Sequence, residues 1–273
     1  MPVNDKKIFN IYGDNNMISN ENKYRFEYIC DAVTDSEKVS DGIGTLSEKT
    51  LHSVLKKYYE FNSDFHEIKV GKYVADIYNN TNTKKGYTTD IVEIQTANFN
   101  KLRGKLDYFL KNHSVTVVYT IPHIKNLSWV DTDTGQISKA RRSPKTGNEF
   151  MAAKELYKIK MYLLNPNLHI HIALIDLDEY RLLNGYSADK KKGSTRNERL
   201  PVGLFDIITI DKINDYKKLI PDNLADTFTS ADYAKCAKVT LSMAQCALNI
   251  LTHTESVIRT GKKGNAIIYR RNL

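Results

Sequence analysis

In the first half of the chain the pattern of apolar residues changes from one typical of helices to one typical of strands. The helical stretch precedes residue 60, and its apolar members are Leu46, Leu51, Val54, Leu55 and Tyr58. Three short runs typical of β-strands follow, at 65–70, 73–78 and 91–96. Because turns containing Gly71 and Gly86 separate these runs, we predict a three-stranded antiparallel meander.

A second helix and further strands follow the meander. Residues 98–110 place apolar side chains on one helical face, and residues 115–121 form a β-branched run. A strand–helix–strand unit of this length makes a right-handed crossover, so 115–121 should lie parallel to the preceding strand. After a loop carrying Trp129, residues 149–164 predict a helix and 168–177 another strand. The expected fold class is α/β, with a mixed sheet flanked by helices.

The hydrophobic pattern also suggests three segments. Residues 1–40 are polar and weakly periodic, so we expect an N-terminal arm to which we assign no function. Residues 41–205 should form the α/β domain, near whose end 180–200 has the composition of an exposed loop. A different pattern covers 212–273, where two short helices around a tight turn precede two strands joined by a basic turn. These residues should form a small second domain.

Composition narrows the class of protein. The chain has 273 residues, of which 41% are hydrophobic, enough for a buried core. Its apolar runs are too short to cross a membrane and its amino terminus lacks a signal pattern, so we expect a cytoplasmic protein. The three cysteines have no metal-ligand spacing, which argues against a zinc site or a disulfide framework.

The charge favours a polyanionic partner. The net charge is +8, and basic residues gather in 139–145, 190–196 and 259–271. Arg141, Arg142 and Lys145 belong to the first group and are candidate contacts to a DNA backbone. The alternative for each group is a solvated loop.

Two acids lie inside the apolar strand patterns of the meander. Asp76 belongs to the second strand and Glu93 to the third, where a carboxylate is unfavourable unless it is paired or binds a metal. We therefore predict a site for Mg²⁺, or for Mn²⁺. The alternatives are an Asp76 paired with a neighbouring lysine and a Glu93 on a partly exposed face. His169 and His171 also share one strand face, for which packing in an edge strand is the favoured explanation.

The element order and the acids resemble the PD-(D/E)XK nuclease superfamily, the fold of many restriction endonucleases. The resemblance covers residues 45–121 and implies that Asp76 and Glu93 bind catalytic magnesium. It places Gln95 where most members have lysine, and Glu48 where the first helix often adds an acid. Since glutamine is not a general base, Gln95 would orient the attacking water through its amide.

Three cations follow the third strand, at the start of the next helix. Lys101, Arg103 and Lys105 are candidates for an electrostatic clamp on the scissile phosphate. The alternative is an exposed helix face.

The segment 212–273 resembles a winged helix-turn-helix domain. The second of its helices would enter the major groove of DNA, where Ser242, Gln245 and Asn249 carry groups that read base edges. Lys262 and Lys263 in the basic turn would hold phosphate or probe the minor groove. The whole chain is also similar to uncharacterised bacterial and phage proteins that pair such a core with such a domain.

Together these observations predict a magnesium-dependent endonuclease that hydrolyses phosphodiester bonds in duplex DNA. Duplex cleavage often needs two active sites, which is compatible with a homodimer. The alternative is a DNA-binding regulator whose nuclease-like core no longer cuts. A third alternative, which the sequence does not exclude, is an enzyme that acts on RNA or on four-way junctions.

Overall fold

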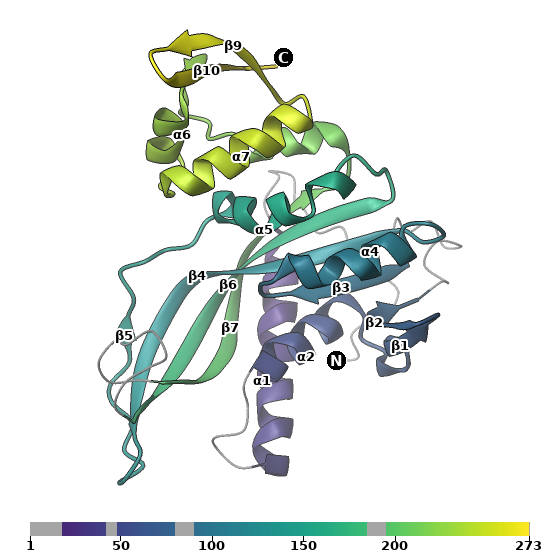
Figure 1. Ribbon diagram of the computed structural model, residues 1–273. Helices are drawn as coiled ribbons and strands as arrows, with labels where there is room; N and C mark the ends of the chain where they lie inside the picture. Colours follow the sequence, from purple (N-terminus) through teal and green to yellow (C-terminus); the bar gives the residue numbers. More distant parts are fainter. Residues whose placement is uncertain (1–17, 42–47, 80–89, 185–194, 273) are drawn as a thin grey trace. The chain divides into compact units, whose positions relative to one another are not determined.

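The computed structural model describes residues 18–41, 48–79, 90–184 and 195–272 (Figure 1). The α-helices are α1 (Asn20–Asp41), α2 (Glu48–Tyr59), α4 (Arg103–Phe109), α5 (Ala153–Lys158), α6 (Ser230–Cys236) and α7 (Leu241–His253). Short 3₁₀ helices are η1 (Ser63–Phe65), η2 (Phe99–Leu102), η3 (Glu149–Ala152), η4 (Lys160–Tyr162) and η5 (Ile213–Leu219). The strands are β1 (His66–Val70), β2 (Tyr73–Tyr78), β3 (Ile91–Gln95), β4 (Val115–Asp131), β5 (Arg141–Arg142), β6 (Leu168–Leu183), β7 (Thr195–Ile210), β8 (Thr227–Phe228), β9 (Val257–Lys263) and β10 (Ala266–Arg271).

The chain divides into two compact units. Unit 1 contains Met1–Val54, Ile124–Pro144 and Ile175–Ile207, and unit 2 contains Leu55–His123, Lys145–Leu174 and Ile208–Leu273. The strands β4, β6 and β7 pass from one unit into the other along the chain. Residues 212–273 fall in unit 2, together with α4 and α5. That they fold as a domain of their own stays a prediction.

The large sheet is mixed, which confirms the expected α/β class. Its strand order is β1-β2-β3-β4-β6-β7, and β5 pairs with β4 beside this path. The first three strands are antiparallel neighbours, as predicted for the meander. β3 and β4 are parallel, with Glu93 opposite Val117 and Gln95 opposite Tyr119. The predicted crossover through 98–110 is therefore confirmed, with η2 and α4 as its helical part.

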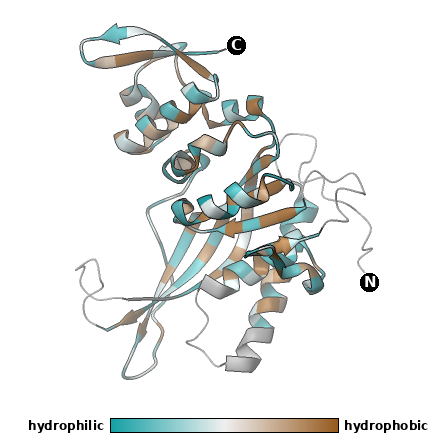
Figure 2. Ribbon diagram, turned by 45° about the vertical axis from the view of Figure 1, so that its right-hand side comes forward, coloured by the Kyte–Doolittle hydropathy of each residue, from teal (hydrophilic) through white to brown (hydrophobic). Residues whose placement is uncertain are grey.

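A continuous hydrophobic core fills unit 2. Phe99, Leu102 and Leu106 of the crossover pack in the same cluster as Val117 and Ile170 of the sheet. The strands of the sheet carry both hydrophobic and hydrophilic segments, drawn brown and teal (Figure 2). The cluster fixes η2 and α4 against the strands that carry the candidate acids.

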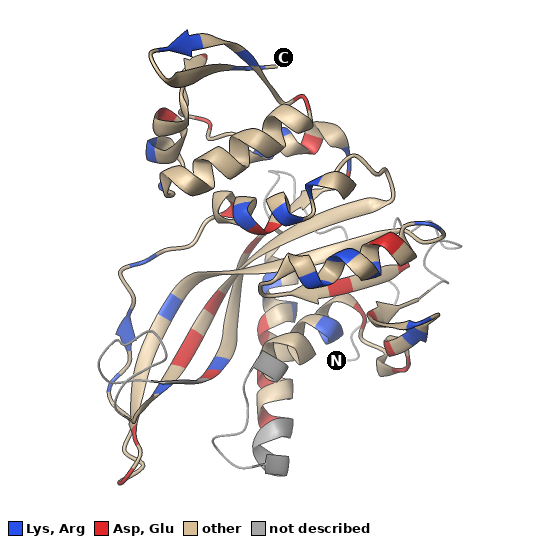
Figure 3. Cartoon of the chain, viewed as in Figure 1, with Lys and Arg blue, Asp and Glu red and all other residues tan. Residues whose placement is uncertain are grey.

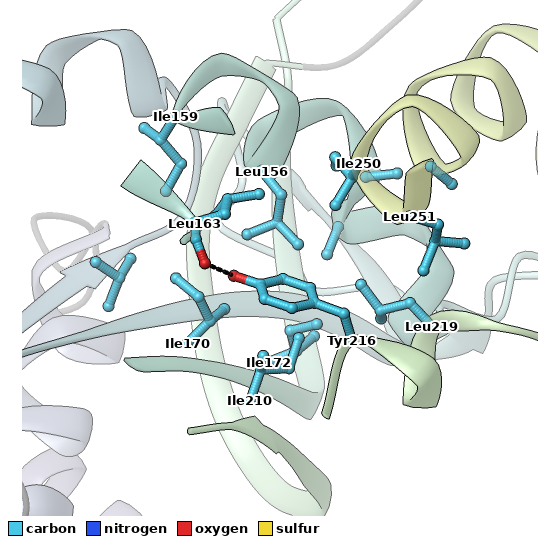
Figure 4. Close-up of a cluster of buried hydrophobic side chains, with 14 of the residues drawn as sticks. Leu156, Ile159, Leu163, Ile170, Ile172, Ile210, Tyr216, Leu219, Ile250 and Leu251 are labelled. Atoms are coloured by element: carbon cyan, nitrogen blue, oxygen red, sulfur yellow. Dashed lines mark hydrogen bonds between the residues drawn. The ribbon is translucent and has the colours of Figure 1, made fainter. Parts of the chain in front are cut away.

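The C-terminal helices share this core with α5 and β6. Leu156, Ile250 and Leu251 surround the ring of Tyr216, whose hydroxyl donates a hydrogen bond of 3.2 Å to the carbonyl of Leu163 (Figure 4). Tyr216 is 2% exposed, and burial raises the pKa of its phenol. Hydrophobic packing therefore joins α7 to the same unit as the meander.

Part of the expected N-terminal arm is helical. Residues 20–41 form α1, a helix of 22 residues. The buried residues Phe26, Ile29, Cys30 and Val33 recur at helical spacing on this helix. The stripe is narrow and most other positions are polar, so the helical period is weak in the sequence.

Several strands are longer than expected. β4 continues to Asp131, so Trp129 lies in a strand and not in a loop. β6 continues to Leu183, and β7 replaces part of the expected loop at 180–200, of which residues 185–194 lie outside the described part. Polar strands of this kind are stabilised by charge pairing. In unit 1 the fully buried Glu179 lies 2.6 Å from Arg181 and 3.3 Å from Arg199.

Two smaller corrections concern the segment between β4 and β6. The predicted loop at 139–145 contains the short strand β5, which pairs with β4. The predicted helix at 149–164 is divided into η3, α5 and η4. The break follows Lys158, because Ile159 leaves the helical backbone region at φ −112° and ψ 20°.

The predicted helices and hairpin of the C-terminal segment are confirmed as elements. The hydroxyl of Thr229 caps α6 and that of Thr240 caps α7. β9 and β10 form the expected hairpin, and β8 adds a third strand beside β10. None of the helices within the described ranges is long and apolar enough to cross a membrane.

Candidate active site

The strands β2 and β3 bring the two predicted acids together in unit 2. Ile77 lies opposite Val92 in this antiparallel pair. The next two facing positions are therefore Asp76 on β2 and Glu93 on β3. The backbone amide of Ile94 donates a hydrogen bond of 2.7 Å to Asp76 Oδ2. Asp76 is half-buried, whereas Glu93 is completely buried. The carboxylate of Glu93 is therefore closed off from solvent, whereas that of Asp76 remains partly accessible.

The counterion of the buried Glu93 comes from α4. Lys105 Nζ lies 2.7 Å from Glu93 Oε2 and 3.0 Å from Oε1, so it bonds both carboxylate oxygens. The helix α4 packs on β2 through aromatic rings, since Tyr73 contacts Tyr108 and Phe109 edge to face. A Cβ atom at position 104 would lie 2.7 Å from the hydroxyl of Tyr73. A larger residue there would require the end of the Tyr73 side chain to shift.

Burial dominates the electrostatics of Glu93. Loss of solvent and then the charge of Asp76 raise the pKa of Glu93 to about 7, although Lys105 and a backbone hydrogen bond from Asp76 lower it. The carboxyl thus changes charge near neutral pH. Perturbed carboxyl groups beside a second acid occur often in functional sites.

The oxygen atoms of Asp76 and Glu93 are of the type that Mg²⁺ and Mn²⁺ prefer. At Glu93 the ammonium of Lys105 already contacts both oxygens, so a cation there would have to replace it. Across the described ranges, no group of three or more His, Cys, Asp or Glu side chains is arranged to hold a metal ion. The described part of the predicted ligand set is thus a pair of carboxylates, one of which is bonded by Lys105.

The remaining predicted residues of this site have different positions. Gln95 is half-buried two residues beyond Glu93, and residues two apart on a strand share a face. Glu48 is the first residue of α2, but its side chain lies outside the described part. Lys101 is exposed, and Arg103 Nε donates a 2.7 Å hydrogen bond to the carbonyl of Lys158. Of the three candidate phosphate contacts near α4, only Lys105 reaches an acid of the site.

The link between Lys105 and Glu93 was not expected from the sequence. Lys105 was predicted to contact phosphate, and lysine pairing was considered for Asp76 instead. The signal available in the sequence is the crossover itself, because its helix must cover the face of β3 that carries Glu93. Which helical position reaches the carboxylate depends on the entry angle of η2, and that angle is not encoded in the spacing.

The predicted base-reading residues lie on α7. Ser242 and Gln245 are exposed, while Asn249 Oδ1 accepts a 2.9 Å hydrogen bond from Lys160 Nζ. A pocket of about 270 Å³ lies beside this stripe, lined by Ser230, Gln245, Asn249, Arg259, Asn265, Ala266, Ile267 and Tyr269. Lys262 and Lys263 are exposed at the end of β9, where the cartoon of the hairpin is coloured blue for basic residues (Figure 3).

The basic residues at 141–145 are all exposed. Arg141 lies opposite Leu127 and Arg142 opposite Asn126, so the two arginines point to opposite faces of the sheet. Lys145 follows the strand and belongs to unit 2. A flat surface therefore cannot contact both arginines at once.

The explanation of His169 and His171 by an edge strand is wrong, because β6 lies between β4 and β7. Both imidazoles face Asp211, at 3.3 and 3.7 Å from its Oδ1. Their other ring nitrogens are 3.0 Å from Ser114 Oγ and from the hydroxyl of Tyr59. The two imidazoles hold the pKa of Asp211 well below its usual range against the opposing effect of burial.

Comparison with known proteins places the chain in a family. The model of the family described as "Domain of unknown function (DUF8091)" matches residues 49–211, more than half of the chain. The chain belongs to the DUF8091 family. The matched region includes β1, β2, β3 and α4, and with them Asp76, Glu93 and Lys105.

One similar protein extends the comparison beyond the DUF8091 region. An "Uncharacterized protein" of Treponema pallidum (strain Nichols) is 23% identical over 235 residues, covering 84% of this chain and 87% of the relative. The similarity therefore extends over most of both chains. No solved structure matches.

Proposed function

We propose that the protein is a magnesium-dependent endonuclease that hydrolyses phosphodiester bonds in DNA. The observation that carries this proposal is the buried Glu93, bonded on both oxygens by Lys105 and next to Asp76 along the ladder. Burying an ion pair costs desolvation free energy, and strongly perturbed buried acids cluster at functional sites. The order of α2, three antiparallel strands, crossover helix and parallel strand also agrees with the resemblance to PD-(D/E)XK nucleases.

Phosphodiester hydrolysis requires charge stabilisation around the phosphate and a nucleophilic water. Mg²⁺ held by Asp76 and Glu93 would supply both, as a Lewis acid that lowers the pKa of water. Lys105 brings a positive charge to the Glu93 carboxylate, whereas position 95, which holds lysine in most members of the superfamily, is glutamine. Gln95 would orient the water with its amide, which donates and accepts hydrogen bonds but takes up no proton.

The C-terminal elements support DNA as the substrate. The exposed Ser242 and Gln245 on α7 carry groups that read base edges, and Lys262 and Lys263 supply charge for phosphates. The acceptor oxygen of Asn249 already bonds Lys160, so this residue would present its amide hydrogens. In this proposal the winged helix-turn-helix arrangement grips the duplex that the acids cut.

Cleavage of plasmid and branched DNA with and without Mg²⁺ tests the proposal. We expect cleavage by the wild type, and by the control Asp64→Ala, in which the same change affects an exposed aspartate near β1. Asp76→Ala should lose the activity, because one of two metal ligands is gone. Equal cleavage by Asp76→Ala and the wild type would refute the assignment.

The same ion pair also favours a second candidate function, a DNA-binding regulator without nuclease activity. A lysine that neutralises both oxygens of Glu93 and a glutamine at position 95 are features that suit an inactive core. Calorimetry with Mg²⁺ or Mn²⁺ separates the two candidates. DNA binding without metal binding at Asp76 and Glu93 would support the regulator.

The nucleic-acid class is tested by comparing affinities for duplex DNA, single strands, RNA and four-way junctions. The salt concentration must be fixed, because phosphate contacts make affinity strongly salt-dependent. The proposal expects the tightest binding to duplex DNA.

A further inference from the structure

The ion pair between Lys105 and Glu93 has a property beyond simple neutralisation. A single ammonium bridges both oxygens of a carboxylate that is completely buried, while 24% of the lysine side chain is exposed. The carboxylate therefore has no room to move toward solvent, whereas the lysine has. Any exchange of partners at this position must involve the lysine.

A divalent cation at Glu93 would compete with this ammonium. Both would bind the same two oxygens, and two cations at one carboxylate repel each other strongly in a buried site. Once a divalent cation supplies the positive charge, Glu93 no longer needs Lys105 as its counterion. The two partners are therefore mutually exclusive by space and by charge.

The side chain of Lys105 can change conformation without a change in the backbone. Its ammonium ends a flexible four-carbon stem, and it lies in the first turn of α4. Arg103, in contrast, donates a hydrogen bond of 2.7 Å from Nε to the carbonyl of Lys158. The helix can thus keep its place while the lysine side chain changes rotamer.

We propose that Lys105 is an exchangeable counterion, which neutralises Glu93 in the resting protein and is displaced when a divalent cation binds. The displaced ammonium remains on α4 beside the carboxylate pair, where it can meet the phosphate of a bound nucleic acid. This inference rests on the proposed function for the identity of the cation and the substrate. It adds that the lysine lowers the metal affinity of the free protein and so couples metal binding to release of a charge.

Titration calorimetry with Mn²⁺ alone, without DNA, tests the exchange. Lys105→Met removes the competitor, so we expect Mn²⁺ to bind about tenfold tighter than to the wild type, within the usual range of coupling between sites. Lys111→Met is the control, because it removes the same charge from an exposed position. It should bind Mn²⁺ like the wild type, and Glu93→Gln should bind it weakly whether or not Lys105 is present.

A second measurement uses the wild type and does not depend on how well the variants fold. Acetic anhydride modifies accessible lysines, and mass spectrometry gives the rate at each position. Adding Mn²⁺ should increase the modification rate of Lys105 severalfold, whereas Lys111 should be modified at the same rate in both conditions. This result is expected because the amine leaves its carboxylate only when the cation arrives.

The outcomes separate this inference from the proposed function. Unchanged Mn²⁺ affinity in Lys105→Met, or unchanged modification of Lys105, would overturn the exchange even if the wild type cuts DNA. Tighter binding and faster modification in a protein that does not cut would support the exchange and refute the nuclease. A wild type that neither binds Mn²⁺ nor cuts would refute both.

Discussion

The raised pKa of Glu93 predicts an unusual pH dependence of stability in the metal-free protein. The pKa rises from the model-peptide value of 4.5 to about 7, mainly because the carboxyl is buried. Between these values the folded state holds a proton that the unfolded state has lost. The folded state binds more protons, so the free energy of unfolding falls as pH increases through this interval. A carboxyl group whose pKa is lowered on folding shows the opposite dependence on pH. At Glu93 burial outweighs the ion pair with Lys105, so the pKa is raised.

The size of the effect follows from the shift. One pKa unit corresponds to about 1.4 kcal/mol, so the change from 4.5 to about 7 corresponds to roughly 3 kcal/mol of stability lost between pH 5 and pH 8. Glu93→Gln cannot lose this proton. Relative to the wild type, it should therefore gain about 3 kcal/mol in stability on going from pH 5 to pH 8.

Urea unfolding in EDTA, at pH 5 and at pH 8, measures this difference. Glu27→Gln is the control, since it makes the same substitution at an exposed position of α1. Its stability relative to the wild type should be nearly the same at both pH values. The reasoning is refuted if the difference between Glu93→Gln and the wild type is also independent of pH.

Three other outcomes follow from particular contacts. Tyr216→Phe removes the buried hydrogen bond to the carbonyl of Leu163 and should lower the free energy of unfolding by about 1 to 3 kcal/mol in urea titrations, because the carbonyl stays buried. Leu156→Ala, at a completely buried position, should cost about 2 to 5 kcal/mol in the same assay. Replacing Lys262 and Lys263 by glutamine should weaken DNA binding for all sequences and reduce the salt slope by about one per lysine, measured by fluorescence anisotropy.

Much of the meander was predictable because its physics is local. The strand-like runs 73–78 and 91–96 are separated by a polar turn and not by a helix, which favours antiparallel pairing of neighbouring strands. The crossover through 98–110 is constrained almost as tightly by the handedness of strand–helix–strand units. Both rules, strand pairing across a turn and crossover handedness, concern elements that follow one another along the chain. They can therefore be applied to a single sequence.

The missed elements depend on partners far away in the chain. The first part of β7 carries charged and polar residues that are typical of a loop, and in the folded chain Arg199 contacts Glu179 of β6, 20 residues away. α1 likewise has a narrow apolar stripe among polar residues. In both cases tertiary burial and charge pairing outweigh a weak local preference.

The candidate site shows the same division between local pattern and distant contact. The sequence suggested Asp76 and Glu93 because acids are rare inside apolar strands, and the structure brings them next to each other along the ladder. It could not show which cation neutralises Glu93, since several basic residues surround the crossover. The packing of α4 against the sheet places Lys105 on Glu93.

That placement changes how the glutamine at position 95 should be understood. If the positive charge of the site had to come from the strand, glutamine would leave the carboxylates without a cationic partner. Because α4 delivers Lys105 to Glu93, the charge is present without a lysine at position 95. A lysine at both positions would place two ammonium groups around one buried carboxylate, which is unfavourable. Gln95→Lys should therefore be less stable than the wild type and should gain stability when Lys105 is replaced by methionine. Equal stabilities of Gln95→Lys and the double variant in urea would show that position 95 and Lys105 do not share a carboxylate.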